Sequence, residues 1–165
     1  MTVDTFYIPS SIDTQHPMYI DSAKIEDIPQ LCILLEVLFS QEAEFKPDTD
    51  LQGQGLRKII SSPAIGEIVV ARETGSIIGM ASLLYTVSTA LGGPVAILED
   101  MVVLPQARGA GVGSGLVNCC LEIARLKGCK RITLLTDHNN FEAHRFYQQH
   151  GFTRSSMVTF RKSIF

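Results

Sequence analysis

A glycine-rich stretch between a predicted strand and a predicted helix constrains this chain more than any other feature. The stretch reads Arg108-Gly109-Ala110-Gly111-Val112-Gly113-Ser114-Gly115-Leu116. It follows the apolar run 95–104, which predicts a strand, and it opens a segment with apolar residues at helical spacing. Glycine permits positive φ and close approach of the backbone to a ligand. Such a turn presents backbone N–H groups at the positive end of a helix dipole, so it predicts a phosphate or pyrophosphate site.

The glycine spacing excludes two common phosphate-binding motifs. A P-loop needs a Lys followed by Ser or Thr after its second glycine, and this stretch lacks that pair. A dinucleotide fingerprint needs G-x-G-x-x-G, but the sixth position is Ser114 counted from Gly109 and Leu116 counted from Gly111. The pattern that remains is R-x-x-G-x-G, from Arg108 to Gly113. A turn that only permits tight packing is the alternative, but alternating glycines at a helix start are destabilising without a use.

This pattern resembles the acetyl-CoA signature of the GCN5-related N-acetyltransferases, the GNAT family. The matching residues are Val103-Leu104-Pro105-Gln106-Ala107-Arg108-Gly109-Ala110-Gly111-Val112-Gly113. A second motif follows in the family's order and at its separation: Asn140-x-x-Ala143-x-x-x-Tyr147-x-x-x-Gly151-Phe152. A weaker signal is the segment 21–35, which contains Glu26-Asp27-Ile28-Pro29. The resemblance covers residues 18–162 and implies an acyl-CoA N-acyltransferase fold.

The resemblance implies acetyl-CoA as a co-substrate and names the residues that bind it. The pyrophosphate lies at the turn formed here by Arg108, Gly109, Ala110, Gly111, Val112, Gly113 and Ser114. In the family, two parallel strands separate beyond a bulge, and the pantetheine arm bonds to the backbone of residues matching Met101, Val102 and Val103. Unpaired N–H and C=O groups at such an edge fit the amides of the arm. For Asn140, two roles stay open: contact with the co-substrate and capping of its helix.

Acetyl transfer to an amine needs a base for the ammonium proton and benefits from an acid for the departing thiolate. Glu99 and Asp100 precede the expected pantetheine segment. Adjacent strand residues face opposite sides, so we expect only one carboxylate to face the acceptor, and we favour Glu99. A β-bulge in this strand would change which of the two carboxylates faces the acceptor. Tyr147 matches the family's tyrosine and is the predicted acid, with a core aromatic as its alternative role.

The acceptor, a small-molecule or peptide amine, is not specified by the sequence. The resemblance implies that the first helix and its following loop help to shape this site. That segment carries acidic residues that either attract a cationic amine or serve only solubility: Glu36, Glu42, Glu44, Asp48 and Asp50. A non-catalytic regulatory module that binds acetyl-CoA or a nucleotide is the second function class. Asp137 ends the strand after the glycine turn, where a ribose-binding acid would sit.

Composition narrows the class of protein and its partners. The chain has 165 residues, is 45% hydrophobic and carries a net charge of −3 without a basic cluster, which argues against nucleic acid as a partner. It has no apolar run near the ~20 residues of a membrane span, and residues 1–17 do not form a signal peptide pattern. Its four cysteines form no CxxC pair, so we expect reduced thiols, no metal site and a cytoplasmic protein. A homodimer stays open.

The order of predicted elements indicates an α/β (α+β) fold with a mixed, mostly antiparallel sheet flanked by helices. Residues 1–17 are expected to be an N-terminal extension, and residues 18–165 a single N-acetyltransferase domain. The crossover helix makes the strand 95–104 parallel to the strand 131–136. The predicted strands are 18–23, 67–72, 77–86, 95–104, 131–136 and a final extended segment 153–162. The predicted helices are 25–35, 51–60, a helix from Val112 that ends at Gly128, and 140–150.

Overall fold

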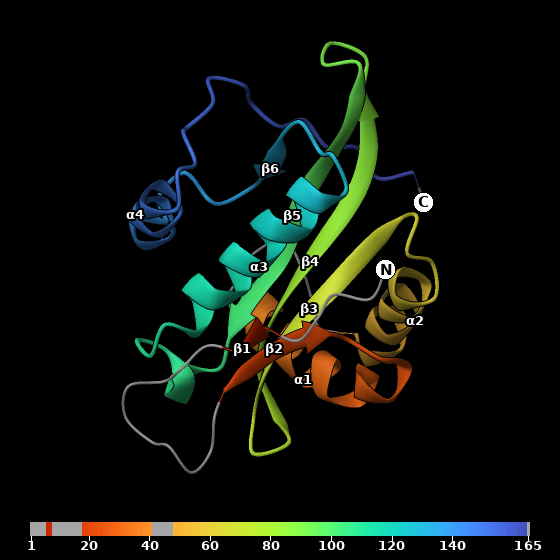
Figure 1. Ribbon diagram of the computed structural model, residues 1–165, viewed down its shortest axis with the longest axis vertical. Coiled ribbons are helices and arrows are strands. Elements are labelled where there is room, and N and C mark those ends of the chain that lie inside the picture. The colour runs from red at the N-terminus through yellow and green to blue at the C-terminus, as the bar shows by residue number, and fades with distance from the viewer. Residues whose placement is uncertain (1–5, 8–17, 41–47, 165) are drawn as a thin grey trace. The chain divides into compact units, whose positions relative to one another are not determined.

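The computed structural model describes residues 6–7, 18–40 and 48–164, which form two compact units, Met1–Leu135 and Thr136–Phe165 (Figure 1). The first unit holds a six-stranded sheet in the order β1-β2-β3-β4-β5-β6. Strands β1 to β5 are antiparallel to their neighbours, and β6 is parallel to β5. The predicted mixed, mostly antiparallel sheet is therefore confirmed. The strands are β1 Phe6–Tyr7, β2 Tyr19–Ser22, β3 Gly66–Glu73, β4 Ser76–Ser88, β5 Gly93–Val103 and β6 Ile132–Leu134.

Helices of the first unit cover both faces of this sheet. They are the short η1 Ile25–Asp27, α1 Ile28–Phe39, α2 Thr49–Ile60, the short η2 Pro105–Ala107 and α3 Val112–Leu126. Adjacent residues of β4 show the two faces, because successive strand residues point in opposite directions. Met80 packs in a core cluster with α1 and α2, whereas a Cβ at Gly79 would lie 3.1 Å from Leu116 of α3.

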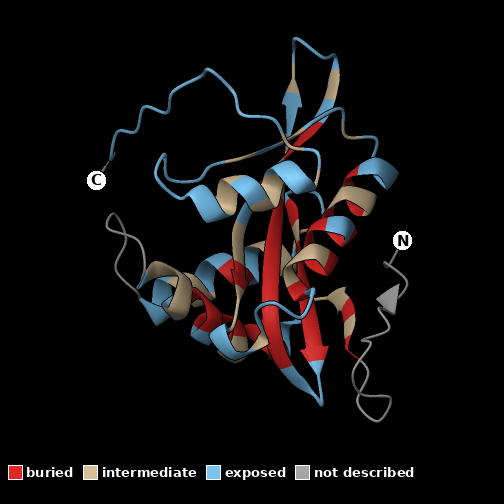
Figure 2. Cartoon of the chain, turned by 90° about the vertical axis from the view of Figure 1, so that its left-hand side faces the viewer, coloured by how far each residue is buried: buried red, intermediate tan, exposed pale blue. Residues whose placement is uncertain are grey.

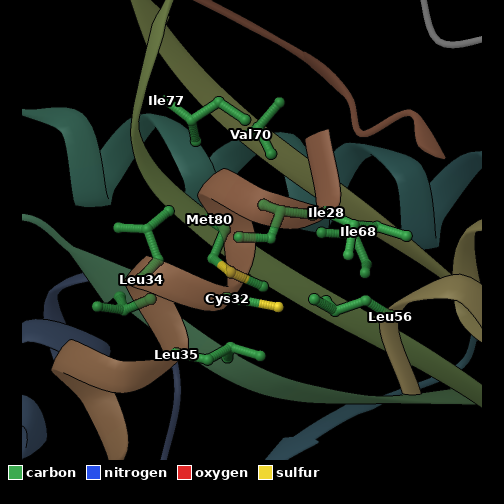
Figure 3. Close-up of a cluster of buried hydrophobic side chains, with 11 residues drawn as sticks. Ile28, Cys32, Leu34, Leu35, Leu56, Ile68, Val70, Ile77 and Met80 are labelled. Atoms are coloured by element: carbon green, nitrogen blue, oxygen red, sulfur yellow. The ribbon is translucent and has the colours of Figure 1, made fainter. Parts of the chain in front are cut away.

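The core cluster on the α1 and α2 face contains most of the residues that the apolar periodicity predicts. Helical spacing predicts one apolar face from Ile25, Ile28, Leu31, Cys32 and Leu35; Ile25 is exposed, but the last four are buried. They pack with Leu34, Leu56 of α2 and the sheet residues Ile68, Val70, Ile77, Met80 and Val102 (Figure 3). Buried residues are concentrated in the central strands and on the helix faces turned toward them (Figure 2). This core fixes β5 between two helical layers and so positions the strand that leads into the glycine-rich turn.

A buried ion-pair cluster joins the start of α1 to the sheet. Arg72 of β3 donates to Asp27 through Nη1 (3.0 Å) and Nη2 (2.7 Å), and to Asp21 through Nε (2.8 Å). The Lys24 N–H also donates to Asp27 Oδ2 at 2.7 Å. Burial by itself raises the pKa of Asp27, but the hydrogen bonds from Arg72 and Lys24 outweigh it and lower that pKa. Asp27, part of the weaker family signal, therefore has a structural role as the acidic anchor of this helix.

Several element boundaries differ from the predicted ones. Helix α2 begins at Thr49 rather than Leu51, because the Asp48 side chain accepts a hydrogen bond from the Leu51 N–H (3.0 Å) and caps the helix. Phe6 and Tyr7, placed by the sequence in a surface extension, pair with Ile20 and Tyr19 as an edge strand. The acidic residues Glu42 and Glu44 lie outside the described residues. Within the described part of the chain, no helix combines the length and apolar character needed to cross a membrane.

The second unit contains α4, Phe141–Gln149, where a helix was predicted. The predicted final extended segment 153–162 is wrong as a strand, because residues 152–164 form no ladder in the structure. The segment instead makes local contacts, such as the 3.1 Å hydrogen bond from the Met157 N–H to Ser155 Oγ. Its apolar residues indicate an extended pattern, but a strand also needs a neighbour that supplies backbone hydrogen bonds, which a pattern of side chains does not reveal.

Candidate active site

The glycine-rich turn has the backbone geometry that its sequence predicts. Gly109 and Gly111 have φ values of 79° and 82°, in the left-handed region that favours glycine. A Cβ on either residue would meet no atom of the described chain within 4 Å, so these positions face open space. Gly113 lies in the first turn of α3. The glycines at the turn therefore supply positive φ, and Gly113 adds no side chain to the first turn of α3.

The start of α3 presents backbone donors at the same turn. Gly115 is the first residue whose N–H bonds to a carbonyl of the turn, that of Gly111, at 2.9 Å. The N–H groups of Val112, Gly113 and Ser114 precede this bond, where a helix has no internal acceptors for them. Together with the helix dipole they form the kind of site that binds phosphate oxygens. Arg108, exposed at the head of the turn, adds a positive charge.

Strand β5 has an open edge directly before this turn. Its parallel neighbour β6 pairs with it only through Ala96, Ile97 and Leu98. From Glu99 to Val103, the ladder of β5 is with β4 alone among the described residues. This geometry matches the separation of parallel strands that the family resemblance implies. The edge can accept a ligand that carries amides, because its backbone groups on that side have no neighbouring strand.

A β-bulge at the middle of β5 changes where the two acidic side chains lie. Ser82 pairs with Glu99 and Met80 with Val102, so Asp100 and Met101 together oppose one residue of β4. Asp100 is the strained residue of the bulge, because its φ is 48°, a value that residues with a side chain rarely adopt. The expectation that neighbouring carboxylates face opposite sides is corrected by this bulge. Asp100 Oδ2 accepts a 3.4 Å hydrogen bond from Ser82 Oγ, and Ser82 is the cross-strand partner of Glu99.

Ser82 shows which face of the sheet these carboxylates approach. It pairs with Ile68, which packs in the core cluster under α1 and α2. Directly opposed residues in a ladder point to the same face, so Ser82 and Glu99 lie on the α1 and α2 side. Ser82 is fully buried, Asp100 is half-buried and Glu99 is exposed. Glu99 is therefore the carboxylate with the freer access to solvent.

The second motif accounts for the architecture of α4. Asn140 Oδ1 accepts from the Ala143 N–H at 3.1 Å, which caps the helix, and Gly151 ends it with φ at 83°. The Tyr147 ring contacts Phe146 and Phe152, with centroid distances of 5.2 Å and 5.7 Å. Capping is thus observed for Asn140, and aromatic packing for Tyr147. Contact of Asn140 with the co-substrate and the acid role of Tyr147 stay predictions.

The family model for the acetyltransferase (GNAT) family matches residues 29–152. The chain belongs to the GNAT acetyltransferase family. The N-acetyltransferase YhfO of Bacillus subtilis (strain 168), described as uncharacterized, is 35% identical to this GNAT chain over 117 residues, 70% of the chain and 78% of that protein. The aminoalkylphosphonate N-acetyltransferase of Salmonella typhimurium is 28% identical over 133 residues, 81% and 83% of the two chains. A Trypanosoma brucei acetyltransferase structure has a TM-score of 0.70 at 28% identity and covers 89% of this chain and 99% of that one.

This GNAT chain is accordingly an acyltransferase enzyme of a family that uses acetyl-CoA. The turn and the open β5 edge lie inside the matched region, where the family resemblance predicts them. Sequence reasoning missed Ser82, which lies in a continuous apolar strand and offers no motif. Its only sequence signal is a hydroxyl side chain in the middle of a mostly apolar run.

Burial raises the pKa of all four cysteine thiols of this GNAT enzyme, which disfavours the nucleophilic thiolate. All four are free thiols, and Cys32, Cys119 and Cys120 are buried. Burial raises the pKa of Cys119 to about 12, and the carboxylates of Glu67 and Glu122 add to that shift. Cys119 is then a neutral thiol at physiological pH, which argues against a covalent intermediate on it. Among the described residues, no three His, Cys, Asp or Glu side chains form a group that could hold a metal ion.

A second polar cluster lies around Tyr85 of β4. Glu67 Oε1 accepts from Ser22 Oγ at 2.8 Å, and Glu67 Oε2 is 3.9 Å from Lys127 Nζ. The same Lys127 Nζ lies 4.8 Å from the centre of the Tyr85 ring. The Tyr85 hydroxyl is buried and has no hydrogen-bond partner among the described residues. An unpaired buried hydroxyl is destabilising, so this cluster contains a group that the fold does not need.

We expect Tyr85→Phe to raise the free energy of unfolding by about 1 kcal/mol at neutral pH, because it removes the unpaired hydroxyl and keeps the ring under Lys127. Burial, followed by the charges of Glu67, Cys129 and Cys120, raises the pKa of Tyr85. Because the folded state disfavours the ionised phenol, this titration leaves stability unchanged below the ordinary pKa of about 10 and lowers it as pH rises above that value. Denaturant unfolding near pH 7 and pH 11 should show a smaller alkaline loss in the variant. Destabilisation at pH 7 would instead indicate a bound water that satisfies the hydroxyl.

Proposed function

We propose that this chain transfers the acetyl group of acetyl-CoA to a primary amine by direct attack in a ternary complex. The observation that carries the proposal is the continuity of the open β5 edge with the glycine-rich turn. The edge offers backbone groups for the pantetheine amides along the segment from Met101 through Val102 to Val103. The Val103 groups face this edge, whereas those of Val102 face β4. The turn, from Arg108 to Ser114, offers N–H groups and a positive charge for the pyrophosphate. A single extended ligand with amides at one end and phosphates at the other fits both.

In this proposal, Glu99 takes the proton of the bound ammonium, directly or through a water, so that the nitrogen has a lone pair for attack. The new bond joins that nitrogen to the thioester carbon, and the bond between this carbon and sulfur breaks. Tyr147 gives its proton to the departing thiolate, and the second proton of the amine leaves the amide nitrogen to water, from which the Tyr147 phenolate is reprotonated. Glu99 is favoured over Asp100 because it is exposed, whereas Asp100 is half-buried in the bulge and accepts a hydrogen bond from Ser82. Asn140 is proposed to contact the co-substrate in addition to capping α4.

We propose small amines as acceptors. The relative from Salmonella typhimurium is named for an aminoalkylphosphonate, which supports a small-molecule acceptor over a protein. Among the described acidic residues of the first helical region, Glu36, Asp48 and Asp50 would attract a cationic amine. We further propose that residues 18–165 act as one catalytic domain in the cytoplasm. The family match supports one domain, because it extends from α1 into α4.

One assay tests the proposal: release of free CoA thiol from acetyl-CoA across a panel of amines that includes aminoalkylphosphonates, amino sugars, polyamines and lysine. We expect amine-dependent release with at least one small amine. The competing function is a regulatory module that binds acetyl-CoA or a nucleotide without chemistry. Tight acetyl-CoA binding without thiol release for any amine would favour that module, and tighter binding of NAD than of CoA would favour a nucleotide sensor.

Tyr147→Phe should lower turnover by about 10- to 100-fold, at or below the usual contribution of general acid–base catalysis. The loss is partial because a CoA thiolate is a tolerable leaving group and water can supply the proton. The ring that packs against Phe146 and Phe152 is kept, so stability and acetyl-CoA affinity should change little. Steady-state kinetics over a range of pH measure the effect. Tyr85→Phe is the matched control, since it removes a phenol hydroxyl outside the proposed site. Full turnover of Tyr147→Phe at every pH would return Tyr147 to a packing role.

A further inference from the structure

Arg108 makes a specific contact with the strand before the glycine-rich turn. Its Nε donates a hydrogen bond to the main-chain carbonyl of Val103, at 3.1 Å. The two residues are five positions apart, with η2 between them. This contact joins the end of the open β5 edge to the head of the turn, which are the two places where the proposed function puts the two halves of acetyl-CoA.

The neighbouring hydrogen bonds show which way the Val103 carbonyl points. The Leu104 N–H donates to the carbonyl of Ile78 at 2.9 Å, and Val103 is the cross-strand neighbour of Gly79. In an antiparallel ladder, this pattern makes Gly79 and Val103 a non-hydrogen-bonded pair, whose own N–H and C=O groups point away from each other's strand. The Val103 carbonyl therefore points to the open edge. Arg108 bonds to the very edge that the pantetheine arm would use.

A guanidinium group can bind the Val103 carbonyl and a phosphate of the co-substrate at the same time. It has five N–H donors in a rigid fork, and the bond to Val103 uses the Nε donor, so the Nη donors face elsewhere on an exposed side chain. A carbonyl oxygen has two lone pairs, so Val103 can still accept a bond from an incoming amide. Lysine would keep the charge without the planar fork. Glutamine would keep a donor without the charge.

We propose that Arg108 is a positioning residue that holds the open β5 edge in register with the glycine-rich turn, so that the pantetheine arm is bound correctly even without its phosphates. This inference rests on the proposed function and deepens it. An arginine that acts only as a phosphate ligand would have no influence on a donor that lacks phosphates. A positioning residue would influence both kinds of donor, since it acts through Val103.

The test compares two acetyl donors, acetyl-CoA and S-acetylpantetheine, which lacks the phosphates and the nucleotide. We expect Arg108→Gln to lower kcat/KM for S-acetylpantetheine by about 3- to 10-fold, the effect of one hydrogen bond, and for acetyl-CoA by about 100-fold, because a charged contact is lost too. Arg108→Lys should recover part of the acetyl-CoA rate and none of the S-acetylpantetheine rate. Arg125→Gln is the matched control, because Arg125 is an exposed arginine whose partner is Glu122 on α3.

Two outcomes would overturn the positioning role. Unchanged kcat/KM for S-acetylpantetheine in both Arg108 variants would make Arg108 a phosphate ligand only. A wild-type enzyme that uses acetyl-CoA but shows no rate above background with S-acetylpantetheine would mean that the edge is not held ready for the arm alone. Thermal unfolding of each variant shows that the fold is intact. Failure of the wild-type enzyme with acetyl-CoA and every amine would instead contradict the proposed function, which separates the two failures.

Discussion

Turnover of Glu99→Gln should fall by about 10²–10⁴-fold, the usual contribution of a positioned general base. The substitution keeps the size and polarity of the side chain and removes its ability to take a proton. Glu99 is exposed, so the loss of its charge should not unfold the chain. Acetyl-CoA affinity, measured by calorimetry, should stay unchanged, since the proposed binding groups lie in the backbone after Glu99 and in the glycine-rich turn.

The pH profile separates this role from a general effect of charge. If Glu99 is the base, the acidic limb of the kcat/KM profile should change in Glu99→Gln. Glu73→Gln is the matched control, because Glu73 is an exposed carboxylate at the far end of β3. A wild-type rate in Glu99→Gln combined with a large loss in Asp100→Asn would transfer the base role to Asp100. That result would also give the bulge a direct catalytic purpose, since the bulge is what turns Asp100 toward Ser82.

The sequence predicted helix faces, helix ends and the glycine-rich turn correctly, because each of these depends on one local physical signal. Apolar spacing along α1 predicted buried residues such as Leu31 and Leu35, because a helix that packs on a sheet must cover one face. Glycine and asparagine signals predicted the ends of α4, where Asn140 caps the helix and Gly151 has positive φ. The glycine-rich turn was also predicted well, since positive φ at Gly109 and Gly111 is a local requirement of the backbone.

The bulge in β5 was implied by the family resemblance, but the residues alone could not place it. A bulge is defined by the register of two strands, and no residue type near Asp100 requires it. Asp100 adopts positive φ there, which is unusual for a residue with a side chain. The interaction of Ser82 with Asp100 depends on that register as well. The failed strand 153–162 has the same origin, because its residues specify an extended pattern and not a partner.

Gly111→Val should reduce acetyl-CoA affinity by more than about 100-fold while leaving a folded protein. The φ of Gly111 is 82°, which costs an L-residue about 1–2 kcal/mol, and a β-branched side chain tolerates it poorly. Its Cβ would meet no described atom of the chain within 4 Å, so the side chain would project into the open space of the proposed phosphate site. It would stand beside the N–H groups of Val112 and Gly113 and keep phosphate oxygens from them.

Gly128→Val provides the control that isolates the ligand from the backbone. Gly128 follows the other end of α3, has φ at 70° and also faces open space. Both variants should therefore lose similar unfolding free energy in denaturant titrations, while only Gly111→Val should lose acetyl-CoA binding in calorimetry. Equal affinity in the two variants would place the pyrophosphate elsewhere. The contrast is decisive because the same substitution is made at two glycines with similar positive φ, at the two ends of one helix, and only proximity to the predicted phosphate oxygens differs.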